Sequence, residues 1–273
     1  MNTPDHSQEI EVMLGAFASG VSQALEDNFL ALYVFGSYAA GDFVPESSDI
    51  DFLGIAHRPL NATEAARLAA LHRRLASNSP WGGRLEGGYA ARHQIRDWGL
   101  EGSIAAVEPG RDFVPSVPSD YSADNMLALR EHGRALVGPP PTDLIPPVSR
   151  QVLEGALRDY LADLLERPER AAPGSVASDA KLGEWLLNAA RCLCGLRTGR
   201  VSTKAEAAVW LAGELPDLTP ALETALAQRS NREAGRGTRA RLLAAFAALR
   251  AAVPALLAMP ATMARRGGLG SDA

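Results

Sequence analysis

The segment from Leu32 to Ile55 places two aspartates one residue apart, between runs of apolar residues typical of β-strands. The first run ends in Gly36-Ser37, a polar turn-forming stretch follows, and the second run carries Asp49 and Asp51. Because successive side chains of a strand point to opposite faces, the two carboxylates share one face. The segment therefore predicts a strand, a turn and a second strand that displays paired acids.

Two carboxylates on one strand face repel each other unless a positive charge lies between them. Because Mg²⁺ prefers hard oxygen ligands, it is the cation that this pair favours. Gly36 allows the backbone to approach a ligand closely, and Ser37 adds a hydroxyl where a short helix or turn is expected to begin. The free N–H groups of a helix start can hold phosphate oxygens.

A third carboxylate, Glu86, lies in the next predicted strand, residues 84–91. Phosphoryl and nucleotidyl transfer need charge neutralisation on the phosphates, a positioned hydroxyl and a base that takes its proton. Two aspartates on a metal and a nearby glutamate supply these functions. Glu101 and Glu108 remain alternatives to Glu86 as the base.

Apolar residues at helical spacing predict further elements, and a change in composition divides the chain. The early part has predicted strands and helices over 9–25, 31–36, 49–56, 59–75 and 122–137. Asn61 or Thr63 could cap the fourth of these elements, and the proline-rich residues 109–120 are predicted to form a loop. After Pro147 only helical patterns follow, over 149–167, 177–198, 203–214, 219–230 and 236–258.

The sequence therefore predicts two domains of different class. Residues 1–148 are expected to form an α/β domain with a mixed sheet and helices. Residues 149–273 are expected to form an all-α helical bundle, with a disordered tail from about residue 260.

Charge and cysteine content exclude several classes of protein. A net charge of −5 disfavours a nucleic-acid binder, which would carry a basic stripe, and suits a cationic small-molecule substrate. Cys192 and Cys194 are too few for a four-thiolate zinc site and are expected to be buried as small apolar residues. We find no signal peptide pattern and expect no membrane-spanning stretch, which predicts a cytoplasmic protein.

The spacing of Gly36-Ser37 and Ser48-Asp49-x-Asp51 resembles the motif of the polymerase-β-like nucleotidyltransferase superfamily. In that motif a Gly-Ser pair at a helix start is followed roughly ten residues later by D-x-D.

Two later segments narrow the resemblance. REHGRALVGP (130–139) and WLLNAARCLCGLRTGRVSTKAEAAVWLAGELP (185–216) are similar to the bacterial streptomycin/spectinomycin adenylyltransferases and their helical C-terminal domain. The resemblance covers about residues 30–255. It implies a nucleotidyltransferase with the predicted two-domain fold, in which a drug hydroxyl attacks the α-phosphorus of ATP. The products would be the O-adenylylated drug and pyrophosphate.

The resemblance also implies a role for each matching residue. Asp49 and Asp51 would bind Mg²⁺, with two ions expected, and Glu86 would be both a metal ligand and the base. Arg191 and Lys204 would bind ATP from the helical domain.

Three residues of the strand–turn segment, Gly36, Ser37 and Ser48, would bind the nucleotide. The partners implied are ATP and a cationic aminoglycoside or aminocyclitol, bound by a monomer without nucleic acid or membrane.

Lys204 and Arg191 are unusual even without the family resemblance. Thr203 and Glu206 form a T-x-x-E capping box, so Lys204 falls in the first helical turn, where a cation opposes the helix dipole. Arg191 is a charge in an apolar helical stretch and needs a partner. A triphosphate could serve, and so could Glu184 or Asp179.

The chain departs from the family at two positions. Family members that accept both drugs keep an acidic residue where Lys181 stands and a tryptophan near the position of Arg111. A lysine would repel a cationic guanidino sugar, which favours a spectinomycin-type acceptor over streptomycin. Two other functions stay open: transfer to a protein, a metabolite or an RNA end, and nucleotide sensing without catalysis.

Overall fold

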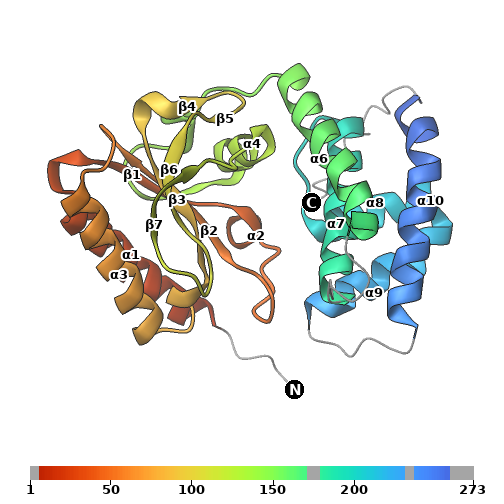
Figure 1. The fold of residues 1–273 in the computed structure, drawn as a ribbon, viewed down its shortest axis with the longest axis horizontal. Helices are drawn as coiled ribbons and strands as arrows, with labels where there is room; N and C mark the ends of the chain where they lie inside the picture. Colours follow the sequence, from red (N-terminus) through yellow and green to blue (C-terminus); the bar gives the residue numbers. More distant parts are fainter. Residues whose placement is uncertain (1–5, 171–178, 231–236, 259–273) are drawn as a thin grey trace, which may run out of the picture. The chain divides into compact units, whose positions relative to one another are not determined.

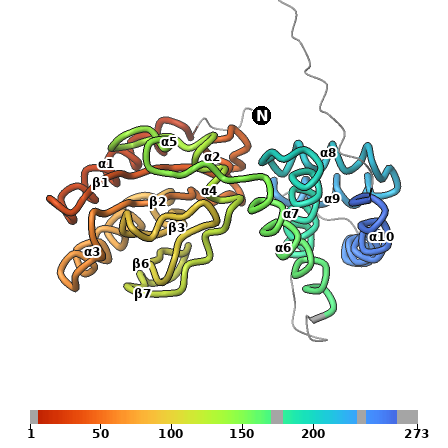
Figure 2. The backbone as a smooth tube through the Cα atoms, turned by 90° about the horizontal axis from the view of Figure 1, so that it is seen from above, coloured from red at the N-terminus to blue at the C-terminus, as the bar shows by residue number. Residues whose placement is uncertain are grey.

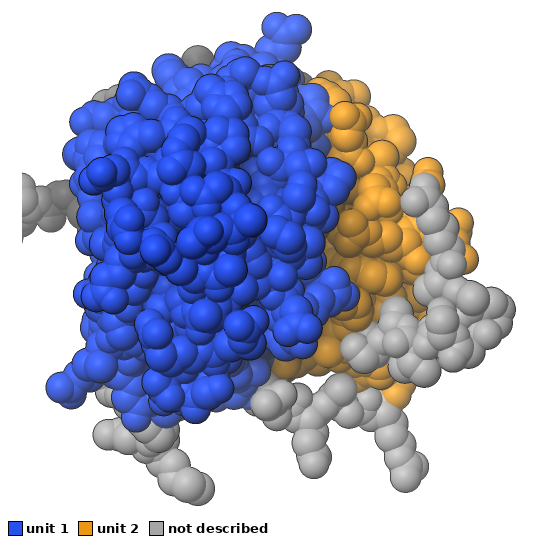
Figure 3. Space-filling model, turned by 60° about the vertical axis from the view of Figure 1, so that its left-hand side comes forward, with its two compact units in different colours: residues 1–156, 229–231 blue, residues 157–228, 232–273 orange. Residues whose placement is uncertain are grey.

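A computed structural model describes residues 6–170, 179–230 and 237–258. The chain separates into two compact units, residues 1–156 with 229–231 and residues 157–228 with 232–273 (Figure 3). This division falls inside a helix, so the domain boundary at residue 148 stays a prediction. The tail predicted to be disordered from about residue 260 lies outside the described residues.

A six-stranded mixed sheet forms the centre of the first unit, in the order β7-β6-β3-β2-β1-β8 (Figures 1 and 2). Its strands are β1 (Phe29–Val34), β2 (Ile50–Ala56), β3 (Leu85–Ala91), β6 (Ser103–Val107), β7 (Val114–Pro118) and β8 (Arg134–Val137). Only β2 and β3 pair in parallel, and the other neighbours are antiparallel. Two short strands, β4 (Ile95–Arg96) and β5 (Gly99–Leu100), pair separately. The predicted α/β class is confirmed.

Two helices, α1 (Ser7–Leu25) and α3 (Ala62–Asn78), pack side by side on one face of this sheet (Figure 1). They come close because α1 has a glycine at the contact: a Cβ at Gly20 would lie 2.3 Å from Cδ1 of Leu71. Phe17 of α1 meets Phe52 of β2 edge to face, with ring centroids 5.0 Å apart. Ile50 and Phe52 thus point toward the helices, and by the alternation of a strand Asp51 points to the opposite face.

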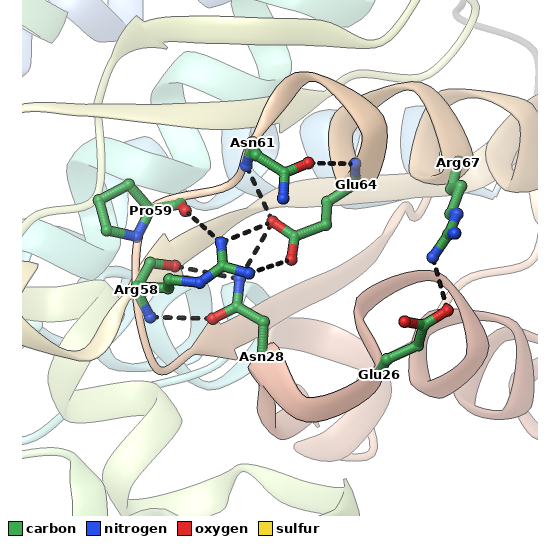
Figure 4. A network of polar contacts seen from close by, with 7 residues as sticks. All are labelled: Glu26, Asn28, Arg58, Pro59, Asn61, Glu64 and Arg67. Atoms are coloured by element: carbon green, nitrogen blue, oxygen red, sulfur yellow. Dashed lines mark hydrogen bonds and ion pairs between the residues drawn. The ribbon is translucent and has the colours of Figure 1, made fainter.

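The start of α3 is held by a reciprocal cap. Of the two predicted candidates, Asn61 is the cap: its side chain accepts from the N–H of Glu64 at 2.9 Å. The Glu64 carboxylate in turn accepts from the N–H of Asn61 at 2.8 Å. Arg58 and Asn28 donate to the same carboxylate, so this network joins α3 to the beginning of β1 and the end of β2 (Figure 4).

The remaining helices of the first unit are short. They are α2 (Gly36–Ala39), α4 (Ala123–His132), α5 (Pro141–Leu144) and the 3₁₀ turns η1 (Glu26–Asn28), η2 (Gly82–Arg84) and η3 (Arg92–Gln94). The helix predicted over 122–137 is wrong at its end, because 134–137 pairs with β1 as an edge strand. Gly133 marks the change: a Cβ there would lie 2.2 Å from the carbonyl oxygen of Leu129.

The loop predicted over 109–120 is also wrong in part, because residues 114–118 form β7. Prolines argue against a central strand but are tolerated at a sheet edge, where one side of the backbone has no partner strand. β7 lies at that edge, beyond β6.

The C-terminal part is helical, as predicted. Its helices are α6 (Arg150–Arg170), α7 (Asp179–Thr198), α8 (Lys204–Glu214), α9 (Thr219–Arg229) and α10 (Thr238–Ala258), with the 3₁₀ turn η4 (Pro216–Leu218). Its core includes Leu186, Leu193, Leu211, Leu222, Phe246 and Leu249. Cys192 and Cys194 are both buried, as expected.

Helix α10 corrects one expectation of the sequence. It is long and apolar enough to cross a membrane when judged by length and composition. A single such helix is weak evidence for a membrane protein, because core helices of soluble proteins meet the same criteria. Leu242, Phe246 and Leu249 of α10 are buried in the second unit, where α10 packs against α7.

Candidate active site

The parallel pairing of β2 and β3 brings the predicted catalytic acids together. Asp51 and Glu86 are direct register partners, on strands that lie about 4.8 Å apart. Asp49 stands two residues before Asp51, on the same face, and forms a side-chain hydrogen bond with Glu86. The three carboxylates therefore occupy one end of the sheet, on the face opposite α1 and α3.

The two alternative bases are held elsewhere. Glu101 forms an ion pair with Arg96, and Glu108 forms one with Arg111. All four side chains are exposed, and neither glutamate is among the charges that act on Glu86. The geometry thus favours Glu86 as the base.

The pKa of Glu86 is raised where several carboxylates lie close together. Burial, which is the largest cause, the charges of Asp51, Asp49 and Asp120, and the hydrogen bond to Asp49 together raise the pKa of this carboxyl from 4.5 to about 7. Asp120 was missed by the sequence reasoning. It lies in the segment between β7 and α4, and only the folding of the sheet brings it near Glu86.

Asp49, Asp51 and Glu86 are the candidate metal ligands of this site. Within 6–170, 179–230 and 237–258, no group of three or more His, Cys, Asp or Glu residues forms a ready-made metal site. Asp49, Asp51 and Glu86 nevertheless offer only oxygen donors, which is the chemistry that Mg²⁺ selects. Their mutual repulsion, seen in the raised pKa of Glu86, is what a divalent cation would relieve. These residues fit a hard cation.

The Gly-Ser turn packs directly against one of the acids. Gly36 has φ +64°, and a Cβ on it would lie 1.8 Å from Oδ2 of Asp51. The backbone N–H of Phe35 also donates to the carbonyl of Asp51 at 3.0 Å. Ser37 follows in the single turn of α2 and is partly exposed. The motif glycine is thus required by the proximity of Asp51 as well as by its own backbone.

Ser48 has a different environment from the one expected. It is buried, and its hydroxyl accepts from the N–H of Val44 at 2.9 Å. Arg84, just before β3, donates to the carbonyls of Pro45 and Ser48. These bonds hold the loop before Asp49 against the start of β3, and the nucleotide role of Ser48 stays a prediction.

The predicted ATP residues of the helical part lie in the second unit. Nε of Arg191 in α7 donates to the carbonyl of Ser202 at 2.9 Å, just before α8. The two acids considered as partners of Arg191 form ion pairs with other cationic side chains. Asp179 lies 3.5 Å from Arg239, and Glu184 pairs with two lysines. No ion pair of Arg191 with either acid is therefore made.

Lys204 is the first residue of α8, as expected. The capping box of Thr203 and Glu206 is confirmed, with bonds of 3.1 Å and 2.9 Å. The ammonium of Lys204 lies 3.7 Å from Glu184, whose other oxygen lies 3.4 Å from Lys181. Glu184 thus forms ion pairs with both lysines and partly neutralises the charge of Lys181.

Two family models match the chain: a nucleotidyltransferase domain over residues 19–78 and the C-terminal domain of aminoglycoside adenylyltransferases over residues 143–252. The chain thus matches a nucleotidyltransferase domain in its first part and the C-terminal domain of aminoglycoside adenylyltransferases in its second part. The nucleotidyltransferase domain identifies the chain as an enzyme of that class.

Comparison with solved structures supports the fold. The spectinomycin adenyltransferase AAD(9) of Enterococcus faecialis, solved with ATP and spectinomycin, matches with a TM-score of 0.67 at 14% identity. The match covers 88% of this chain and 99% of that one. None of the curated proteins compared matches the sequence.

Proposed function

We propose that this enzyme transfers AMP from Mg-ATP to a hydroxyl of an aminoglycoside or aminocyclitol antibiotic, with a spectinomycin-type acceptor favoured over streptomycin. The observation that carries the proposal is the register pairing of Asp51 with Glu86 in a chain that matches both family models. The similar E. faecialis protein is described as a spectinomycin adenyltransferase, which supports the choice of acceptor. We further propose that the enzyme acts as a cytoplasmic monomer.

Each residue of the site has a part in this reaction. The acceptor hydroxyl oxygen bonds to the α-phosphorus, the bond from that phosphorus to the β-phosphate bridging oxygen breaks, and pyrophosphate leaves. Glu86, the register partner of Asp51, takes the hydroxyl proton as the general base. Asp49 and Asp51 would hold magnesium, which when bound supplies positive charge to the phosphate oxygens. Arg191 and Lys204 add positive charge for the triphosphate.

The acceptor preference depends on charge. Asp120 and the three other carboxylates make this end of the sheet negative, which suits a cationic acceptor. The repulsion predicted from Lys181 is reduced, because Glu184 lies 3.4 Å from its ammonium. We therefore expect streptomycin to be a poorer acceptor rather than an inactive one.

Pyrophosphate release tests the proposal. Purified protein with Mg-ATP is given spectinomycin, streptomycin or related aminocyclitols, and spectinomycin should give the highest kcat/KM. Glu86→Gln should lose at least about 100-fold in kcat, since general-base catalysis contributes about 10²–10⁴-fold. Glu101→Gln, at the exposed alternative base, is the matched control and should keep kcat.

Three results would contradict the proposal. One is the absence of pyrophosphate release with every acceptor, and another is full activity of Glu86→Gln. The third is AMP label on a protein or an RNA end instead of on the drug, which would identify a nucleotidyltransferase with a different acceptor.

A further inference from the structure

One hydroxyl bonds to both strands that carry the catalytic acids. Tyr121, in the segment between β7 and α4, donates from its phenol oxygen to the carbonyl of Phe52 in β2 at 2.6 Å. The same oxygen accepts a hydrogen bond from the backbone N–H of Gly88 in β3. Sequence patterns gave no sign of this, because Tyr121 lies far from both strands along the chain.

The two anchoring points lie directly beside the acids. Asp51 and Glu86 are register partners, and the next pair along the strands is Phe52 with Gly87. Gly87 has φ +152°, and a Cβ on it would lie 2.0 Å from the carbonyl oxygen of Phe52. The strands therefore approach here more closely than any side chain on that residue would allow. The hydroxyl of Tyr121 bonds to the same carbonyl.

The backbone of Tyr121 is itself held in place. Its N–H donates to the hydroxyl of Ser119 at 3.2 Å, and its carbonyl accepts from the N–H of Leu100 at 3.4 Å. A Cβ on Gly99 would lie 2.1 Å from that carbonyl oxygen, so β5 passes very close. The ring lies 6.1 Å, centroid to centroid, from Phe35, which precedes the Gly-Ser turn. A phenol fixed at its backbone can hold the strands that it bonds.

We propose that Tyr121 is a positioning residue for AMP transfer: its hydroxyl cross-links β2 and β3 beside Asp51 and Glu86 and fixes the separation of these carboxylates. The catalytic consequence rests on the proposed function, whereas the cross-link itself does not. The hydroxyl of Tyr121 bonds to backbone groups of these strands, so it acts on the acids through the backbone.

Tyr121→Phe tests this with two readouts. Without the hydroxyl, the Phe52 carbonyl and the Gly88 N–H lose their shared partner, so hydrogen exchange at Gly88 should accelerate by about tenfold. Displacement of the carboxylates should lower kcat by about tenfold or more, since a misplacement of about 1 Å can cost about 100-fold. KM for ATP should stay within about twofold, because the predicted ATP residues are untouched. Urea unfolding verifies that the variant folds.

Tyr89→Phe is the matched control. Tyr89 lies in β3, and its side chain is on the face of the sheet opposite the acids. There its hydroxyl lies 2.8 Å from Nε2 of His72 in α3. This variant should lose stability while keeping kcat and the exchange rate at Gly88.

Unchanged exchange at Gly88 in Tyr121→Phe, unchanged kcat, or an equal loss of kcat in Tyr89→Phe would each overturn the proposal. If the wild-type protein adenylylates no acceptor, the proposed function fails, and the exchange at Gly88 alone decides whether the cross-link exists.

Discussion

Replacing Gly36 with alanine should disable catalysis far more than it destabilises the fold. The added Cβ would lie 1.8 Å from Oδ2 of Asp51, and 2.7 Å from its Cγ, so the carboxylate must move. The backbone also carries a left-handed φ of +64°, which costs a residue with a side chain about 1–2 kcal/mol. Gly36→Ala thus combines a general backbone cost with a specific displacement of Asp51.

Gly41→Ala separates these two effects. Gly41 lies in the same segment and has φ +74°, but no atom lies within 4 Å of the position of its Cβ. Both variants should lose about 1–2 kcal/mol in the free energy of unfolding, from the shared backbone cost. Gly36→Ala should lose more free energy of unfolding than Gly41→Ala, because it must also displace the Asp51 carboxylate.

The two variants should differ more in kcat than in the free energy of unfolding. If Asp51 shifts by about 1 Å, kcat should fall about 100-fold, which corresponds to about 2.7 kcal/mol in the activation free energy. Gly41→Ala should keep kcat within about twofold. The assays are urea unfolding and pyrophosphate release at saturating Mg-ATP and spectinomycin. Equal losses of kcat in the two variants would refute the reasoning, because the collision with Asp51 would then have no consequence.

Three further predictions concern single side chains. Glu64→Gln should lower the free energy of unfolding by about 1–2 kcal/mol at pH 7. Burial raises the Glu64 pKa, but hydrogen bonds, chiefly from Arg58, outweigh it and leave the pKa lowered. The stabilisation should therefore be present above the unfolded pKa and disappear as pH falls through the folded pKa, which urea melts across pH would show. His72 behaves similarly: burial lowers its pKa from 6.5 to about 4, so the folded state binds fewer protons than the unfolded state between these values. Unfolding should become easier by about 3 kcal/mol as pH falls from 6.5 to 4, and His72→Gln should abolish this slope. Lys204→Met should raise KM for ATP by about tenfold, and an unchanged KM would remove this residue from the nucleotide site.

Local signals were reliable wherever a few neighbouring residues set the structure. The capping box at Thr203 was predicted correctly, and Asn61 was one of two predicted caps of its helix, because a cap joins side chain and backbone only three residues apart. The helices of the C-terminal part followed from apolar spacing along each segment. The alternation of Asp49 and Asp51 placed both carboxylates on one strand face for the same reason.

Local patterns failed where a distant strand decided the outcome. Residues 134–137 continue a helical pattern but pair with β1, and residues 114–118 contain prolines but pair with β6. Sheet pairing overrides local propensity, because the hydrogen bonds of an edge strand come from residues far along the chain.

The sequence by itself determined the fold class, the acids and the glycine of the motif, since these depend on residue type and short spacing. Only the tertiary structure decided how the acids meet: the parallel register sets Asp51 opposite Glu86, and the fold brings Asp120 close to that pair. It also attached the hydroxyl of Tyr121 to both strands and gave Lys204 and Lys181 a common partner in Glu184. The physical reason is that these interactions depend on distances in space between residues that no periodic pattern of the sequence connects.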